Sequence, residues 1–135
     1  MTKDDVDRWL VEYVAAWKTY KRDRIAALFT EEIAYRYHPY DDPIIGRDEV
    51  VRAWREEGDH PEAGTRDEPD TYDAEYRAVA VDGDTAVATG WSSYKDSADG
   101  PVARVYDNCF VMRFADDSRC REFTEWFLLR KSPGG

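Results

Sequence analysis

The chain has 135 residues and a formal net charge of −10, which excludes surfaces that bind nucleic acid or anionic membranes, because both depend on clustered Lys and Arg. Its length fits one domain, residues 1–135, and aromatic residues make up 14% of it, enough to line a cavity or an interface. Cys109 and Cys120 form no metal-binding motif, and neither a signal peptide nor a membrane-spanning run is evident, so we expect a cytoplasmic protein with reduced thiols.

Helices are predicted for the first part of the chain. Apolar side chains near the N-terminus recur every three or four residues, which indicates one amphipathic helix. These positions are Val6, Trp9, Leu10, Tyr13, Val14, Trp17 and Tyr20. Thr2 followed by Asp5 resembles a capping box, and Asp23 is placed to cap a second, shorter helix that reaches Phe29.

A short strand and a third helix come next. Residues 33–38 are predicted as a strand that Pro39 closes, and Pro43 and Gly46 bracket a turn. The third helix is predicted over 47–57. The polar stretch 58–69, which contains His60, is predicted as a loop.

From residue 70 onward the pattern changes to long strands. Those segments are 71–81, 85–95, 103–114 and 118–130. Asp82-Gly83-Asp84 and Asp116-Asp117 are turn signals between neighbouring strands. Helices segregated from consecutive strands indicate an α+β fold: a cone-shaped, curved antiparallel β-sheet with three N-terminal helices packed on its concave face. Such a cone leaves a pocket at its wide end.

Five segments resemble one known family in order and spacing. They are the N-terminal helix with Trp17 near its end, Ile25–Glu32, Tyr35–Pro39, Gly46–Trp54 and the terminal strand pair with Phe114–Asp117 and Glu125-Trp126. Together they resemble the nuclear transport factor 2-like superfamily and its SnoaL-like branch, over nearly the whole chain. The resemblance implies a homodimer paired through the outer face of the sheet. It selects no function, because the superfamily includes ketosteroid isomerases, scytalone dehydratase, limonene epoxide hydrolase, polyketide cyclases and non-enzymatic transport modules.

His38, just before Pro39, is the first candidate site residue. Ketosteroid isomerases place their general-base carboxylate before a proline at the end of the first strand, so the resemblance implies a proton-transfer role for His38. The alternative is a structural histidine bonded to a backbone carbonyl or to Asp41.

Glu125 is the second candidate. If Asp116-Asp117 is a two-residue turn, Asn108 lies opposite Glu125 and Phe110 lies opposite Phe123, with Glu125 facing the interior. A partly desolvated Glu125 could then work with His38 as an acid–base pair.

The alternative for Glu125 is an ion pair across the sheet, with Arg104 or Arg121. Further candidate ligand-binding residues are Tyr13, Trp17, Tyr35, Trp54, Trp91, Asn108 and Phe110, and the alternative for most of the aromatic ones is ordinary core. Among them, Trp17 and Trp54 are the preferred pocket aromatics. Asp41 and Asp42 are better explained as turn residues than as metal ligands, and we expect no metal and no cofactor.

Two hypotheses follow for function. The leading one is a pocket for a largely apolar, cyclic or aromatic molecule, in which His38 and Glu125 carry out cofactor-free proton transfer, with Asn108 or Tyr13 as donor to a developing oxyanion. The reaction is then an isomerisation, a dehydration, an aldol cyclisation or an epoxide opening. The alternative is a non-catalytic module of the same fold that binds a ligand or a protein.

Overall fold

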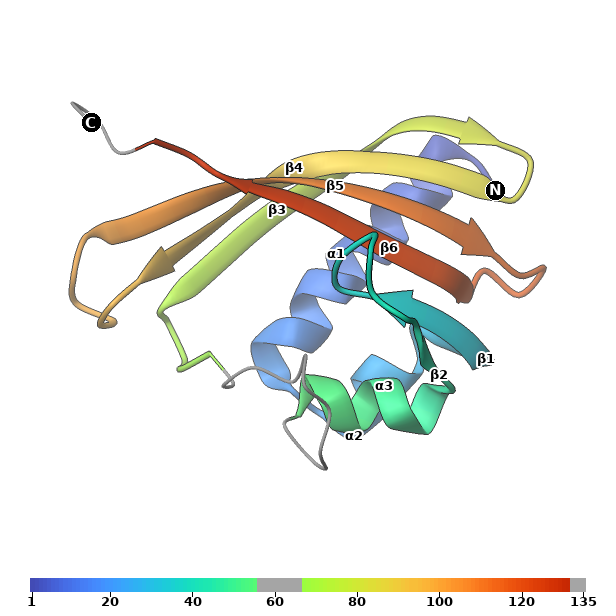
Figure 1. The fold of residues 1–135 in the computed structure, drawn as a ribbon, viewed down its shortest axis with the longest axis horizontal. Helices are drawn as coiled ribbons and strands as arrows, with labels where there is room; N and C mark the ends of the chain where they lie inside the picture. Colours follow the sequence, from blue (N-terminus) through green and yellow to red (C-terminus); the bar gives the residue numbers. More distant parts are fainter. Residues whose placement is uncertain (56–66, 132–135) are drawn as a thin grey trace.

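The computed structural model describes residues 1–55 and 67–131, and in them three helices pack against one curved six-stranded sheet (Figure 1). The helices are α1 (Lys3–Thr19), α2 (Arg22–Ala26) and α3 (Arg47–Trp54). The strands are β1 (Phe29–Arg36), β2 (Ile44–Ile45), β3 (Tyr72–Asp82), β4 (Thr85–Lys95), β5 (Val102–Phe114) and β6 (Cys120–Leu129). The predicted α+β class is confirmed. Most of the predicted loop 58–69, with His60, lies outside the described residues.

The first helix forms as predicted, and the second is shorter. Both hydrogen bonds of the capping box between Thr2 and Asp5 are present at the start of α1. The second helix ends at Ala26 because the chain beyond it is needed in the sheet: the Cys120 N–H donates to the Leu28 carbonyl, 2.9 Å away, and Phe29 opens β1.

The sheet has the order β2-β1-β6-β5-β4-β3 and is mixed, which corrects the fully antiparallel prediction. Strand β1 runs parallel to β6, and every other pair is antiparallel. The predicted turn before Gly46 contains the two-residue strand β2, which pairs with β1. Strand β1 ends at Arg36, so His38 lies beyond the strand in which it was predicted.

The β5–β6 hairpin differs from its predicted register by two residues. Its turn contains three residues, and Ser118 takes the left-handed conformation with φ 68°. The longer turn moves the register by one residue, and a β-bulge between Arg113 and Phe114 moves it by one more, so Phe110 lies opposite Glu125 and Asn108 lies opposite Phe127. A shift of two residues keeps every side chain on its predicted face, because side chains alternate with a period of two.

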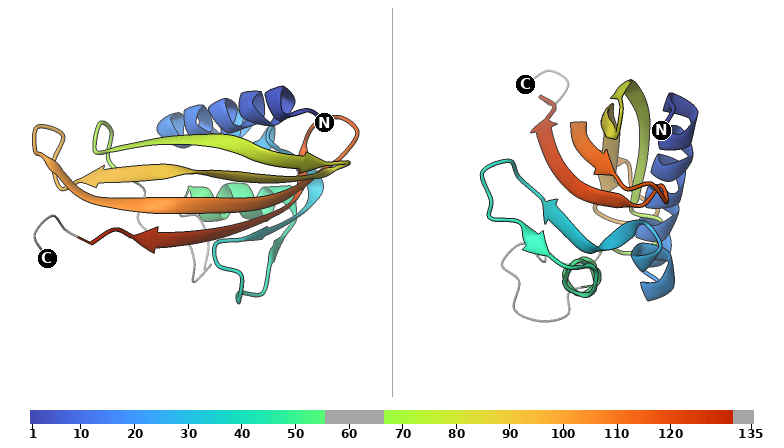
Figure 2. Two further views of the ribbon diagram at one scale, coloured as in Figure 1. Left: turned by 90° about the horizontal axis from the view of Figure 1, so that it is seen from above. Right: turned by 90° about the vertical axis from the view of Figure 1, so that its right-hand side faces the viewer.

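The curvature of the sheet encloses an aromatic interior. Figure 2 shows the sheet curling between α1, which packs along β3, and α3, which packs on β1. Tyr76 lies opposite Gly90, and a Cβ at Gly90 would stand 2.6 Å from the Tyr76 ring and 2.0 Å from the Glu75 carbonyl oxygen. Only glycine admits this close approach of β3 and β4.

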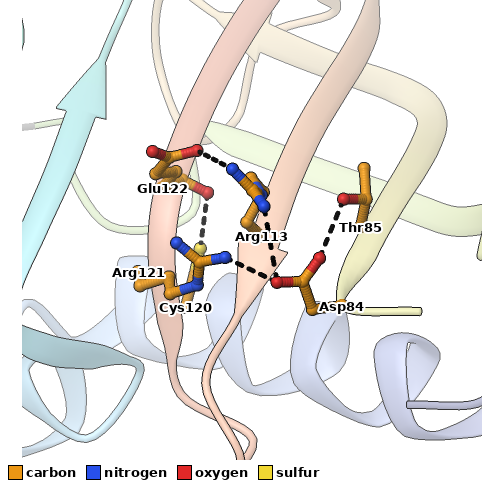
Figure 3. Close-up of polar contacts among 6 residues, drawn as sticks. All are labelled: Asp84, Thr85, Arg113, Cys120, Arg121 and Glu122. Carbon is orange, nitrogen blue, oxygen red and sulfur yellow. Dashed lines mark hydrogen bonds and ion pairs between the residues drawn. The ribbon is translucent and has the colours of Figure 1, made fainter. Parts of the chain in front are cut away.

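A polar cluster ties three strands together at one end of the sheet (Figure 3). Asp84, in the β3–β4 turn, accepts hydrogen bonds from Arg121 of β6 and from Thr85, the latter at 3.0 Å. Arg113 of β5 lies 3.6 Å from both Asp84 and Glu122. This end of the sheet is thus held by charged groups, and the candidate site lies elsewhere. No helix in the described ranges combines the length and the apolar character that a membrane span requires.

Candidate functional site

A cavity of about 340 Å³ opens between the concave face of the sheet and helices α1 and α3. Sixteen residues from three helical or loop segments and five strands line it. They are Tyr13, Trp17, Tyr20, Tyr35, Tyr37, Ala53, Trp54, Asp67, Tyr76, Ser92, Tyr94, Arg104, Tyr106, Asn108, Glu125 and Phe127. Aromatic rings form most of its wall, and five polar or charged side chains enter it, those of Asp67, Ser92, Arg104, Asn108 and Glu125. An apolar wall with a few placed polar groups is usual for a small-molecule site.

Glu125 on β6 is the acidic group within this aromatic wall, and Asn108 on β5 holds it. The Asn108 side-chain N–H donates to Glu125 Oε2 at 2.9 Å, and the Ser92 hydroxyl donates to Asn108 Oδ1 at 3.1 Å. Ser92 and Asn108 are both buried, so their polar atoms depend on each other and on Glu125. The result is a fixed row of three polar side chains across β4, β5 and β6.

The environment of Glu125 favours its protonated form. Burial raises the pKa of the carboxyl from 4.5 to about 7, while the Asn108 hydrogen bond and the charge of His38 act in the opposite direction. Protein surrounds the carboxyl on nearly all sides, yet the residue keeps some accessible surface because it faces the cavity. Such a group can both accept and release a proton near neutral pH.

Two tyrosine hydroxyls meet beside this carboxyl. The Tyr13 and Tyr35 oxygens lie 3.2 Å apart, on α1 and β1. Burial raises the pKa of both phenols well above the usual range, and the negative charge of Glu125 adds to that effect. Both hydroxyls therefore stay protonated and can serve as hydrogen-bond donors.

The rim of the cavity carries a second carboxylate. Trp17 Nε1 donates to Asp67 Oδ2 at 3.1 Å and lies 3.0 Å from the Tyr20 hydroxyl oxygen. The Tyr20 hydroxyl is 3.3 Å from the same Asp67 oxygen. Asp67 is thereby fixed against the end of α1, where the charge disfavours an anionic ligand.

His38 does not line the cavity. Its Nδ1 lies 2.9 Å from Asp41 Oδ2, and its ring stacks on Tyr40 at a centroid distance of 5.0 Å. Phe127, which does line the cavity, packs against His38 at 5.2 Å. His38 was predicted either as a proton-transfer residue or as a structural histidine bonded to a backbone carbonyl or to Asp41. In the structure Asp41 binds the ring, which lies behind Phe127 of the cavity wall. The turn that contains Asp41 explains this aspartate better than a metal site does.

The structure brings most of the predicted site residues together. Tyr13, Trp17, Tyr35, Trp54, Asn108 and Glu125 all line the cavity. Besides His38, two predicted residues do not line it, Phe110 and Trp91. Phe110 faces inward but is packed in the core beneath, 4.5 Å from Tyr76 and 4.8 Å from Phe123 between ring centroids. Trp91 points to the convex face, since it alternates with the cavity-facing Ser92 along β4.

The alternative in which an arginine pairs with Glu125 is wrong. Arg104 lies 3.7 Å from Asp96, and Arg121 is hydrogen-bonded to Asp84. Arg104 nevertheless lines the cavity, with its guanidinium 5.0 Å from the centre of the Tyr94 ring.

Several lining residues escaped the sequence analysis. They are Tyr20, Tyr37, Tyr76, Tyr94, Arg104, Tyr106, Asp67 and Phe127. Strand alternation could have found Tyr94 and Tyr106, because they share parity with Ser92 and Asn108. Nothing local marks Asp67. Within 1–55 and 67–131, no group of three or more His, Cys, Asp or Glu side chains is placed to hold a metal ion.

Comparisons with known proteins agree with this fold. The family model of the SnoaL-like domain matches residues 10–123. A candidate ketosteroid isomerase from Kribbella flavida has a similar structure, with a TM-score of 0.62 at 15% identity, covering 97% of this chain and 83% of the other. An NTF-2 like protein of unknown function from Burkholderia xenovorans gives 0.64 at 15% identity, covering 97% and 89%. An LEH-like epoxide hydrolase from M. tuberculosis gives 0.60 at 14% identity, covering 93% and 84%. Among curated proteins no match is found.

Proposed function

The chain belongs to the SnoaL-like domain family, and we propose that it is a small-molecule enzyme that transfers a proton without a cofactor, with Glu125 as the acid–base group. One observation carries this proposal: a carboxyl group with a pKa of about 7 is hydrogen-bonded by Asn108 in an aromatic cavity. A general base is most effective when its pKa lies near the working pH.

The cavity also supports a class of substrate. Its aromatic walls suit a largely apolar, cyclic or aromatic molecule. The reaction is of the isomerase, dehydratase, cyclase or epoxide hydrolase type. Two similar structures, a candidate ketosteroid isomerase and an epoxide hydrolase, are compatible with these reaction types. At 14–15% identity, however, they do not show which of the reactions this chain catalyses.

The neighbouring residues then have separate tasks. Glu125 as carboxylate accepts a proton from a substrate carbon, and the Tyr13–Tyr35 pair, which uses one of its two hydroxyl hydrogens internally, donates the other to the oxygen on which charge develops. Asn108 acts as a positioning residue rather than as the oxyanion donor, because its N–H is bound to Glu125. The role of base thus moves from His38, which does not line the cavity, to Glu125.

Exchange of an acidic C–H proton tests the proposal. The bicyclic ketone 2-tetralone is incubated with the protein in D₂O near neutral pD, and loss of its α-proton signals is followed by ¹H NMR. The protein should accelerate the exchange, and Glu125→Gln should remove about 10² to 10⁴ of that acceleration. Glu32→Gln, which changes an exposed carboxylate on β1, is the matched control and should keep the wild-type rate.

The alternative is a non-catalytic, ligand-binding module of the same fold. It predicts that 2-tetralone binds and that its α-protons exchange at the rate in buffer alone. Equal rates for bound ketone in the wild type and in Glu125→Gln would therefore favour the module.

We further propose a cytoplasmic homodimer that pairs through the convex face of the sheet. Leu128 is 75% exposed and Trp126 is 43% exposed on β6, and both lie on the face opposite Glu125 by strand alternation. Sedimentation velocity at micromolar concentration should give a dimer for the wild type and a monomer for Leu128→Asp. A wild-type protein that sediments only as a monomer contradicts the dimer.

A further inference from the structure

Arg104 on β5 is a cation in the wall of the cavity whose capacity for hydrogen bonds is unused. Its guanidinium lies over the Tyr94 ring, 5.0 Å from the ring centre, and its side chain is 44% exposed. A guanidinium carries five N–H donors. In the described part of the chain the Arg104 side chain makes no hydrogen bond, and its ion pair there is with Asp96, 3.7 Å away and 86% exposed. So long a contact to an exposed partner is weak, and the donors stay available to a ligand.

Arg104 lies far along the cavity from the proposed acid–base group. It shares a face of β5 with Tyr106 and Asn108, and all three line the cavity. Four residues separate Arg104 from Asn108, which corresponds to about 13 Å along a strand, and Asn108 is the residue that holds Glu125. Strand β5 begins at the β4–β5 loop, at the end of the sheet opposite the polar cluster of Asp84 (Figure 1). The cavity therefore has a carboxyl group at one place and a guanidinium at another.

The two sides of the cavity rim carry opposite charges. On the α1 side, Asp67 Oδ2 accepts from Trp17 Nε1 at 3.1 Å and from the Tyr20 hydroxyl at 3.3 Å. Beyond the effect of burial, the charge of Asp67 raises the pKa of Tyr94, so Asp67 lies near the ring that Arg104 covers. Asp67 already accepts hydrogen bonds from the protein, whereas the donors of Arg104 are unused. An anionic group should therefore bind on the β5 side of the rim and stay away from α1.

We propose that Arg104 binds the carboxylate of a ligand whose apolar ring system lies in the aromatic cavity beside Glu125. The substrate class is then a carboxylic acid with an aromatic or alicyclic body, and Arg104 determines the specificity for its charged end. This inference rests on the proposed function, because it names the substrate of the same cavity. A span of about 13 Å fits roughly two fused rings that carry a short carbon chain. A guanidinium suits the charged end, since it can donate to both carboxylate oxygens at once.

The experiment compares 4-(2-naphthyl)butanoate with 4-(2-naphthyl)butanamide, which has nearly the same shape and no charge. Isothermal titration calorimetry at neutral pH and low salt gives both dissociation constants. The wild type should bind the butanoate about tenfold more tightly than the amide, as a charge-assisted hydrogen bond at a half-exposed site implies. The net charge of −10 opposes binding of any anion, so such a preference requires a local cation. Sodium chloride at about 0.5 M should remove most of the preference, because salt screens exposed charges.

Arg104→Gln should abolish the preference for the butanoate. Arg113→Gln is the matched control, because Arg113 lies on the same strand, is also 44% exposed, and is held outside the cavity by Asp84 and Glu122. Both substitutions change the net charge of the protein by the same amount. A loss of preference in Arg104→Gln alone therefore reports the local contact and not the overall charge.

The inference is overturned if the butanoate does not bind at millimolar concentration or if the wild type binds both ligands equally. It is also overturned if Arg104→Gln keeps the preference, or if Arg113→Gln loses it to the same extent. The wild-type comparison and its salt dependence do not require that any variant folds. The exchange test with 2-tetralone separates the two proposals, since that ketone has no carboxylate. A preference for the butanoate without exchange contradicts only the enzyme, and exchange without that preference contradicts only this inference.

Discussion

Replacing Glu125 with Gln tests the ionisation of the cavity carboxyl through the pH dependence of folding. Its pKa is about 7 in the folded protein, against an ordinary value of 4.5 that applies when the chain is unfolded. Because the folded pKa is raised, this group's contribution to stability is fully present below pH 4.5 and is lost as the pH rises through 7. Gln stays neutral, so the variant does not suffer this loss.

The expected magnitude follows from the two pKa values. Between 4.5 and about 7, at about 1.4 kcal/mol per pH unit, the wild type loses up to about 3 kcal/mol of unfolding free energy relative to the Gln variant. Part of this difference already exists at pH 5. From pH 5 to pH 8 the difference between the two proteins should widen by about 2 kcal/mol.

Urea unfolding followed by tryptophan fluorescence at pH 5 and pH 8 measures this difference. Other groups titrate equally in both proteins and cancel. Glu32→Gln, the exposed control, should parallel the wild type across the range. If Glu125→Gln also parallels the wild type, the carboxyl is not held in a protonating environment, and the acid–base proposal loses its main support.

Three further predictions concern the site and the sheet around it. Asn108→Leu removes the hydrogen bond that lowers the pKa of Glu125, so this pKa should rise above 7 in a ¹³C NMR titration of the carboxyl. Gly90→Ala places a Cβ 2.0 Å from a β3 carbonyl oxygen and should cost about 3 kcal/mol in urea unfolding. Burial raises the pKa of the Cys120 thiol, so Ellman's reagent should modify only the half-buried Cys109 until the protein unfolds.

Each of these three has a control or a contradicting result. Ser92→Ala leaves the Asn108–Glu125 bond in place, so its effect on the carboxyl should be the smaller one. In Gly100→Ala the new Cβ lies 2.9 Å from the Ser97 hydroxyl oxygen, which can rotate away, and at ordinary contact distance from the Ser97 backbone, so the substitution should cost little. Two thiols that react at equal rates in the folded protein contradict the burial of Cys120.

In the β5–β6 hairpin, the predicted faces of the side chains are correct although the predicted register is not. Its turn contains one more residue than the Asp116-Asp117 signal indicates, a bulge between Arg113 and Phe114 adds another, and the register therefore moves by two. Since the side-chain period of a strand is also two, Asn108 and Glu125 still share a face and form a diagonal hydrogen bond. A shift by one residue would have separated them.

The position of His38 follows from contacts that no local pattern contains. Its place depends on where β1 stops pairing with β6, at Arg36, and on the turn that brings Asp41 onto the ring. The same holds for β1 itself, whose parallel pairing with β6 joins segments that are far apart in the chain. Contacts between residues that are far apart in the sequence depend on the packing of the whole sheet.

Local sequence patterns were sufficient for the capping box of α1, its apolar stripe, the long strands and the α+β class, because each depends on the conformational preferences of neighbouring residues. They also placed Tyr13, Trp54 and Glu125 on inward faces. Only the tertiary structure decided that these side chains surround a cavity and that burial raises the pKa of Glu125. Those properties arise because side chains from five strands and two helices meet around the cavity. How strongly water solvates the Glu125 carboxyl depends on all of these elements together and on no single segment.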